Sequence, residues 1–158
     1  MIEAIKKKLQ AELEALNHEL GVVLPETLKR AVALGDLKEN GDYHAARERQ
    51  QFITARLSQL RYRLGQLSQI DLSKIPEGMV GLGSRLVVLD MDSKEKEKLE
   101  LVIPEAMDFE GGQISVSSPL GRALLEKKVG ETVTVRLPDR VRKLKIVELA
   151  TFHEQIQD

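Results

Sequence analysis

Three carboxylates crowd the short stretch from Gly35 to His44, and they are the side chains of this chain best suited to chemistry. They are Asp36, Glu39 and Asp42. Asp36 and Glu39 lie three residues apart, so both can reach one hard cation if the backbone between them is helical or turned. Carboxylates alone bind Mg²⁺ weakly, because the ion keeps its waters and takes further ligands from phosphates or another protein. A metal-dependent phosphodiester reaction here would therefore need a partner that completes the site.

The same acids also have a structural interpretation. Asp36 can cap a helix while Glu39 and Asp42 are simply solvated. An Asp-x-x-Glu spacing is a weak signal, and taken alone it favours this alternative. The three histidines are too scattered along the chain to form a zinc site. We assign no role to His44, the nearest of them, because solvated or capping histidines are more common than reactive ones.

Two long amphipathic helices are predicted on either side of the acids. Apolar residues recur at steps of three and four residues from Ile2 to Val23 and again from Ala46 to Leu67. This is the seam of a coiled coil. We expect one arm from near Met1 to Leu34 and an antiparallel one from about Asp42 to Ile70, each roughly 40 to 50 Å long. Two short helices packed elsewhere are the alternative.

Glycine and proline mark the expected breaks in these arms. Gly35 and the Asn40-Gly41 pair tolerate positive φ, which the turn between the arms requires. Gly21 weakens the middle of the first arm, and Pro25 suits the first turn of a new helix. We therefore expect a kink or a restart of the helix near Pro25.

A second domain is predicted after the periodic leucines stop. We place the boundary between residues 1–74, the hairpin, and residues 75–158, a small α+β domain. β-branched residues predict five strands, at residues 84–89, 98–103, 113–116, 132–137 and 143–149. Ser118 and Pro119 indicate a short helix between the third and fourth strands, around which the sheet would wrap. The tail from Phe152 to Asp158 is expected to be loose.

Composition excludes several classes of protein. Cysteine is absent, so disulfides and thiolate metal sites are impossible. No run approaches the roughly 20 apolar residues that cross a bilayer, and we expect a soluble cytoplasmic protein without membrane contact. A net charge of −1 argues against a protein that simply coats nucleic acid, although charge can be segregated locally. Aromatic residues are too few for base-stacking platforms.

Two separate segments resemble one known family. Residues 35–40, Gly-Asp-Leu-Lys-Glu-Asn, followed by residues 43–48, Tyr-His-Ala-Ala-Arg-Glu, are similar to the tip of the GreA/GreB transcript cleavage factors. Residues 114–124 resemble the C-terminal Ile-Ser-Val-x-Ser-Pro segment of that family, and Val-Gly-Glu at 129–131 also fits. Two motifs in the right order make chance agreement improbable, and the resemblance runs from the first helix to Leu149.

The resemblance implies a mechanism that depends on a partner. The hairpin would enter the secondary channel of bacterial RNA polymerase, whose own active site would cut the nascent RNA of a backtracked complex. Asp36 and Glu39 fall at the essential acidic pair, which helps to retain a second Mg²⁺ and activates water. Asp42 would support them, and Tyr43 would contact the RNA end or active-site elements. The chain itself would be no enzyme, would hold no cofactor of its own and would act as a monomer.

The resemblance also implies how the C-terminal domain acts. It would be FKBP-like and would dock on the rim of the polymerase, which makes Ser118, Pro119 and Leu120 candidate docking residues. One departure lies at the tip, where Asn40-Gly41-Asp42 replaces the more common Asn-Ala-Glu. Glycine loosens the turn and aspartate shortens the reach of the third carboxylate, which can lower metal affinity without changing the role.

The second arm is expected to carry a basic flank behind the tip. Its arginines are Arg47, Arg49, Arg56, Arg61 and Arg63. A solvated helix surface and a surface that faces phosphates both explain such a run. Given the resemblance, Arg47, Arg49 and Arg56 are candidate contacts to the backbone of the displaced RNA.

Two other functions compete with transcript cleavage. The first is a channel-binding regulator or inhibitor of the same shape that does not promote cleavage, although the intact acids argue against it. The second is a prolyl isomerase or chaperone, suggested by the fold of the C-terminal domain. Such enzymes need an aromatic-lined pocket, and Phe109 and Phe152 are the only aromatic residues after Tyr62.

Overall fold

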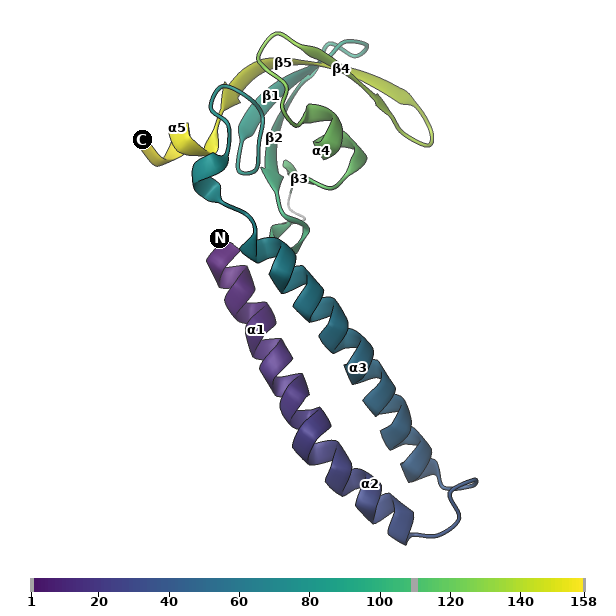
Figure 1. Ribbon diagram of the computed structural model, residues 1–158. Helices are drawn as coiled ribbons and strands as arrows, with labels where there is room; N and C mark the ends of the chain where they lie inside the picture. The colour runs from purple at the N-terminus through teal and green to yellow at the C-terminus, as the bar shows by residue number, and fades with distance from the viewer. Residues whose placement is uncertain (1, 109–110, 158) are drawn as a thin grey trace. The chain divides into compact units, whose positions relative to one another are not determined.

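The computed structural model describes residues 2–108 and 111–157, which form two compact units divided between Ile70 and Asp71 (Figure 1). The first unit is an antiparallel helical hairpin, and the second is a five-stranded sheet with a short helix against it. The predicted α+β class, a helical hairpin followed by a small sheet domain, is confirmed.

The first arm of the hairpin is a continuous helix that is α-helical at both ends and π-helical in the middle. It comprises α1 (Ile2–His18), a π-helical segment (Glu19–Val23) and α2 (Leu24–Ala33). The Leu24 N–H bonds the carbonyl of Glu19, five residues back, and the next residue, Pro25, has no N–H with which to resume the α pattern at once. The expected break is therefore a π-helical turn, and the backbone stays helical through it.

The second arm is α3 (Gly41–Ser68), a single helix of 28 residues. Its apolar stripe packs against the stripe of the first arm, as the periodicity predicts. Ile53 is fully buried, and Leu57 and Leu60 are 2% exposed. The buried residues of this seam are Leu16, Leu24, Ala46, Ile53, Leu57 and Leu60. Burial of apolar side chains along the seam is the main force that holds the arms together.

Two bidentate ion pairs cross the seam and fix its register. Arg49 donates to both carboxylate oxygens of Glu19, at 2.8 and 2.9 Å, and Arg56 donates to both oxygens of Glu12, at 2.7 and 3.0 Å. The arginines are seven residues apart in one direction and the glutamates are seven apart in the other. Only an antiparallel pairing in this register lets both pairs form, so they select one alignment of the arms.

These ion pairs predict how the stability of the hairpin depends on pH. Hydrogen bonds from Arg56 and Arg49 hold the pKa values of Glu12 and Glu19 below their usual value. A lowered folded-state pKa gives stability that is present above the unfolded pKa, near 4.5, and lost as pH falls through the folded value. We therefore expect the amide protection factors of α1 and α3 to fall modestly below pH 4.5, because exposed pairs contribute little.

Substitution separates this effect from general acid destabilisation. The double variant Glu12→Gln with Glu19→Gln is expected to make the protection factors of the hairpin depend less on pH below 4.5. The matched control is Glu48→Gln, since Glu48 has no ion pair within the described part of the chain. If protection falls below pH 4.5 as sharply in the double variant as in the control, the ion pairs do not stabilise the hairpin.

The second unit is a mixed sheet in the order β3-β2-β1-β5-β4. Its strands are β1 (Arg85–Asp90), β2 (Lys96–Val102), β3 (Gln113–Ser115), β4 (Thr132–Arg136) and β5 (Val141–Ala150). All neighbours are antiparallel except β2 and β3, and β5 carries a bulge opposite Val87 and Val88. The five predicted strands are thus present, with small shifts at their ends.

The sheet curves around α4 (Pro119–Leu124), as Figure 1 shows, and the core lies between them. Alternate strand residues point inward, including Val88, Leu101 and Leu144, which are all fully buried. Leu124 of α4 is fully buried among them. The short helix is therefore part of the core of this unit.

The start of α4 makes a close backbone contact. Ser118 caps the helix by accepting from the Gly121 N–H at 3.0 Å, and its hydroxyl donates to the Ser115 carbonyl at 2.7 Å. A Cβ built on Gly121 would lie only 2.1 Å from the oxygen of that carbonyl. Glycine is required here because the approach leaves no room for a side chain.

The C-terminal segment is a helix, so the expectation of a loose tail is wrong for residues 152–157. The Thr151 N–H donates to Glu154 at the start of α5 (Phe152–Gln157). Gln155 donates to the carbonyls of Gly83 and Ala150, and the His153 ring lies 2.8 Å from the Ile75 carbonyl. These side chains bond backbone far away in sequence, which composition cannot reveal. Asp158 lies outside the described residues.

Candidate functional site

The acids lie on the loop that joins α2 to α3 at the tip of the hairpin. Gly35 has φ +126°, as the turn prediction requires. The same prediction is wrong for the Asn40-Gly41 pair. Asn40 is extended, with φ −86° and ψ 101°, and Gly41 is the first residue of α3. The chain reverses through Gly35 and the turn at residues 37–39.

Asn40 ties the two arms together at the tip. Its side-chain oxygen accepts from the Tyr43 N–H at 3.0 Å, which makes it the N-cap of α3. Its amide nitrogen donates to the carbonyl of Ala31, in the last turn of α2, at 2.5 Å. One side chain therefore satisfies the ends of both helices. The preference of asparagine for N-cap positions was the sequence signal for this role, and the turn prediction did not use it.

Two further hydrogen bonds fold the acidic loop on itself. Asp36 Oδ1 accepts from the Lys38 N–H at 3.0 Å, so Asp36 caps its own turn and not a helix. The Nε2 of His44 lies 3.1 Å from the Lys38 carbonyl and must be the donor, because a carbonyl only accepts. The Tyr43 and His44 rings meet in a T-shaped arrangement, with centroids 5.6 Å apart. His44 thus holds the loop in place.

Asp36, Glu39 and Asp42 are all exposed to solvent. With Leu34, Asn40 and Gly41 they line a shallow hollow of about 430 Å³. Within the described ranges, no three His, Cys, Asp or Glu side chains converge closely enough to hold a metal ion. The tip therefore presents three exposed carboxylates that do not form a metal site by themselves in the described part of the chain.

Apolar side chains flank these acids. Leu34 is 71% exposed and Leu37 is 42% exposed. Large apolar side chains are exposed elsewhere on the hairpin as well, including Phe52 at 57% and Tyr62 at 71%, so the two leucines differ from these only in lying beside the acids. The sequence pattern did not single out these leucines, because Leu34 continues the apolar period of the first arm.

The arginines behind the tip do not form a uniformly free basic surface. Arg49 and Arg56 are each held by a glutamate of the first arm, and Arg49 also lies over the Phe52 ring at 5.3 Å. Arg47 donates to Gln50 at 2.9 Å and has no carboxylate partner in the part of the chain that the structure describes. Of the three candidate RNA contacts, Arg47 is thus the one whose charge is uncompensated.

The three candidate docking residues differ in their surroundings. Ser118 is half-buried and its hydroxyl is used as the helix cap. Leu120 packs against the core of the sheet unit, whereas Pro119 is exposed. Of the three, only Pro119 is exposed to solvent.

Removal of the Asn40 side chain is expected to loosen the tip and leave the arms paired. Asn40→Ala loses the N-cap and the bond to Ala31, which together contribute about 1 to 2 kcal/mol of local stability. Hydrogen exchange should accelerate from Gly35 to His44 and stay unchanged at Ile53. Asn17→Ala, which removes an exposed side chain that accepts from Arg61 far from the tip, is the matched control. Equal protection of the tip in both variants would contradict this role.

The fold and tip together define a class of protein: a helical hairpin that presents acids at its tip, followed by a small α+β domain. The chain belongs to the GreA/GreB family of transcription elongation factors. The family model described as the N-terminal domain of transcription elongation factors matches residues 1–68, and the GreA/GreB C-terminal model matches residues 75–151. Members of this family are elongation factors and are not themselves enzymes.

Two named relatives are similar to this chain along most of its length. Transcription elongation factor GreA of Thermodesulfovibrio yellowstonii is 38% identical over 144 residues, 91% of each chain. GreA of Nitratiruptor sp. is 40% identical over 90% of this chain and 87% of its own. A solved GreA/GreB factor from Nitrosomonas europaea is 30% identical, with a TM-score of 0.43 over 55% of this chain and 75% of its own.

Among the residues described here, no helix is both long and apolar enough to cross a membrane.

Proposed function

We propose that this chain is a transcript cleavage factor of the cytoplasm. It binds bacterial RNA polymerase, inserts the hairpin tip into the secondary channel and stimulates the polymerase's own cleavage of the nascent RNA 3′ end. Elongation can then resume from a backtracked or arrested complex. The observation that carries this proposal is the exposure of Asp36 and Glu39 on the tip loop, in a chain of this family.

The hairpin suits delivery of these acids through a narrow channel. Its second arm has 28 residues, which at 1.5 Å per residue is about 42 Å long. Apolar seam packing and crossed ion pairs make the two arms one stiff element. Stiffness matters because a catalytic group must be held in position at the far end of its support.

The residues at the tip fit a shared Mg²⁺ ion. Asp36 and Glu39 would hold it through hard carboxylate oxygens, with Asp42 in support, and the polymerase active site and RNA would supply the other ligands. When bound, Mg²⁺ supplies a Lewis acid that activates water and neutralises charge on the phosphate. The proposal requires these further ligands, because no three His, Cys, Asp or Glu side chains converge within the described residues.

The neighbours of the acids position them and contact the partner. The Lys38 N–H orients one oxygen of Asp36, and His44 and Asn40 hold the loop between the arms. Tyr43, half-buried beside the acids, contacts the RNA end or active-site elements. Leu34 and Leu37 pack against the wall of the channel.

Contacts outside the tip complete the complex. Arg47 meets the backbone of the displaced RNA, since its charge is uncompensated, whereas Arg49 and Arg56 would do so only beside their glutamate partners. Pro119 docks on the polymerase rim, and Ser118 and Leu120 position it. One monomer serves one polymerase.

Backtracked complexes of the cognate polymerase provide the test. Adding the protein with Mg²⁺ to complexes that carry 3′-labelled RNA is expected to release short 3′ fragments much faster than the polymerase does alone. Chelation of Mg²⁺ should abolish the release. Binding of the protein without faster release would reject the proposal and indicate a regulator that occupies the channel.

A further inference from the structure

In the second unit, basic and acidic side chains that alternate along the sequence lie on opposite faces of the sheet. Residues 94–98 read Lys-Glu-Lys-Glu-Lys, which carries almost no net charge. Successive side chains of a strand point to opposite faces, so the lysines of β2 share one face and Glu97 points to the other. Glu97 is paired there with Arg142 at 3.0 Å. Local segregation of charge therefore exists in a chain that is nearly neutral overall.

The strand register places four lysines on the outer face of the sheet, the face opposite α4. Leu89 of β1 pairs with Lys96 of β2 and with Lys145 of β5, so these three side chains form one row. Lys98 comes two residues after Lys96 on β2 and Lys143 two residues before Lys145 on β5, so they lie on opposite sides of this row and face outward as well. The core residues alternate with them and are buried, whereas all four lysines are exposed.

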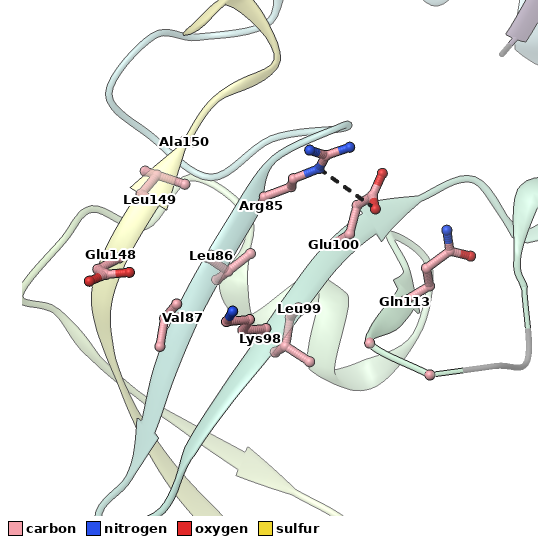
Figure 2. A pocket seen from close by; sticks show the side chains of 12 residues that line it. Arg85, Leu86, Val87, Lys98, Leu99, Glu100, Gln113, Glu148, Leu149 and Ala150 are labelled. Atoms are coloured by element: carbon pink, nitrogen blue, oxygen red, sulfur yellow. Dashed lines mark ion pairs between the residues drawn. The ribbon is translucent and has the colours of Figure 1, made fainter. Parts of the chain in front are cut away.

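These lysines have no carboxylate partner among the described residues. Acidic residues of the outer face lie at its other end, where Arg85 pairs with Glu100 at 3.8 Å. Figure 2 shows that end, a hollow of about 540 Å³ in which Lys98 and Glu148 line opposite sides of Val87. The uncompensated charge is thus greatest around Lys96, Lys143 and Lys145.

We propose that this lysine face, formed by Lys96, Lys98, Lys143 and Lys145, binds the phosphate backbone of nucleic acid without reading its sequence. Residues two apart on a strand are about 7 Å apart, and the strands that carry Lys96 and Lys145 are about 10 Å apart. Neighbouring lysines therefore meet different phosphates of a duplex, which carries one phosphate per roughly 3.4 Å along each strand.

The chemistry of the face favours phosphate over an acidic protein surface. Thr132 pairs with Lys145 and Thr134 with Lys143, which adds hydroxyl donors of the kind that contact phosphate oxygens. Protein interfaces are depleted in lysine and enriched in aromatic residues and arginine. The lysine rows contain no aromatic side chain to stack on bases, so binding depends on contacts to phosphate.

The proposal is tested by measuring how binding to a DNA duplex depends on salt. The full chain is titrated against a 20-base-pair duplex of mixed sequence, and binding is followed by fluorescence anisotropy. Four phosphate contacts predict a slope of log affinity against log salt of about −3.6, or about a 100-fold loss between 50 and 200 mM. A duplex with scrambled sequence should bind equally well. Binding that is undetectable at 20 mM salt, or that does not weaken with salt, would overturn the proposal.

Charge-matched variants locate the site. Changing the four lysines to glutamine is expected to weaken duplex binding at least tenfold, and changing them to arginine should restore it. The control changes four exposed lysines elsewhere, Lys7, Lys29, Lys127 and Lys128, to glutamine and should bind as the unmodified chain does. If duplex affinity falls equally in both glutamine variants, the lysine face is not the binding site. A face variant that keeps duplex affinity and loses affinity for polymerase would also overturn the site, and would assign the face to a protein.

Discussion

Alanine at Asp36 or at Glu39 is expected to slow factor-stimulated RNA cleavage about 100-fold or more. Each substitution removes a carboxylate that the proposed Mg²⁺ site requires, and loss of one charge-stabilising group in an active site commonly lowers rates by about 10² to 10³. Both side chains are exposed, so the pairing of the arms should be unaffected, and only Asp36→Ala also removes the bond to the Lys38 N–H in the tip loop. The measurement is the rate of 3′ fragment release from backtracked complexes at saturating factor.

Controls separate chemistry from binding. Glu48→Ala removes an exposed acid from α3 behind the tip loop and should leave cleavage unchanged. Asp42→Ala is expected to have a smaller effect than either main substitution. The Asp36 and Glu39 variants should still compete with the unmodified protein for polymerase. Cleavage that persists at full rate in both variants would show that the tip acids do not take part.

Alanine at Gly121 is expected to destabilise the sheet unit by about 3 kcal/mol or more. The added Cβ would lie 2.1 Å from the Ser115 carbonyl oxygen, a backbone atom that also anchors the Ser118 cap. The contact can be relieved only by moving α4, whose Leu124 is fully buried in the core. Hydrogen exchange of β1 and β5 during a urea titration measures the change.

Gly65→Ala is the matched control for Gly121→Ala. Gly65 lies inside α3, and a Cβ there meets no atom within 4 Å. Alanine is the better helix former, so this variant should stabilise the hairpin by about 0.5 to 1 kcal/mol. A Gly121→Ala protein with unchanged midpoints in the sheet unit would show that the close approach to Ser115 is not required.

The elements predictable from sequence are those with a long apolar period. Leucines at steps of three and four residues define both arms, because a coiled-coil seam must repeat to stay on one face. β-branched runs define the five strands for a similar reason, since inward positions such as Val88 and Leu144 alternate with exposed ones. The periodicity of apolar residues shows which face of a helix or strand is buried. It therefore predicts the helices and strands and the core residues on them.

The details that position the site depend on contacts between residues far apart in sequence. Asn40 bonds Ala31 only after the arms have paired, and Arg56 finds Glu12 across 44 residues. The helix at residues 152–157 is fixed by side chains that reach backbone near Gly83 and Ile75. The type and spacing of the acids were only a weak signal, and their assignment as an acidic pair rests on the resemblance of the tip segment to the family.

Photocrosslinking from the tip tests the central claim most directly. A photoreactive amino acid in place of exposed Leu37, between the two acids, would be activated in a complex of the factor with backtracked polymerase. We predict crosslinks to the nascent RNA near its 3′ end and to the catalytic centre of the polymerase. Crosslinks confined to the outer surface of the polymerase, in a complex that is fully bound, would contradict delivery of the acids to its active site.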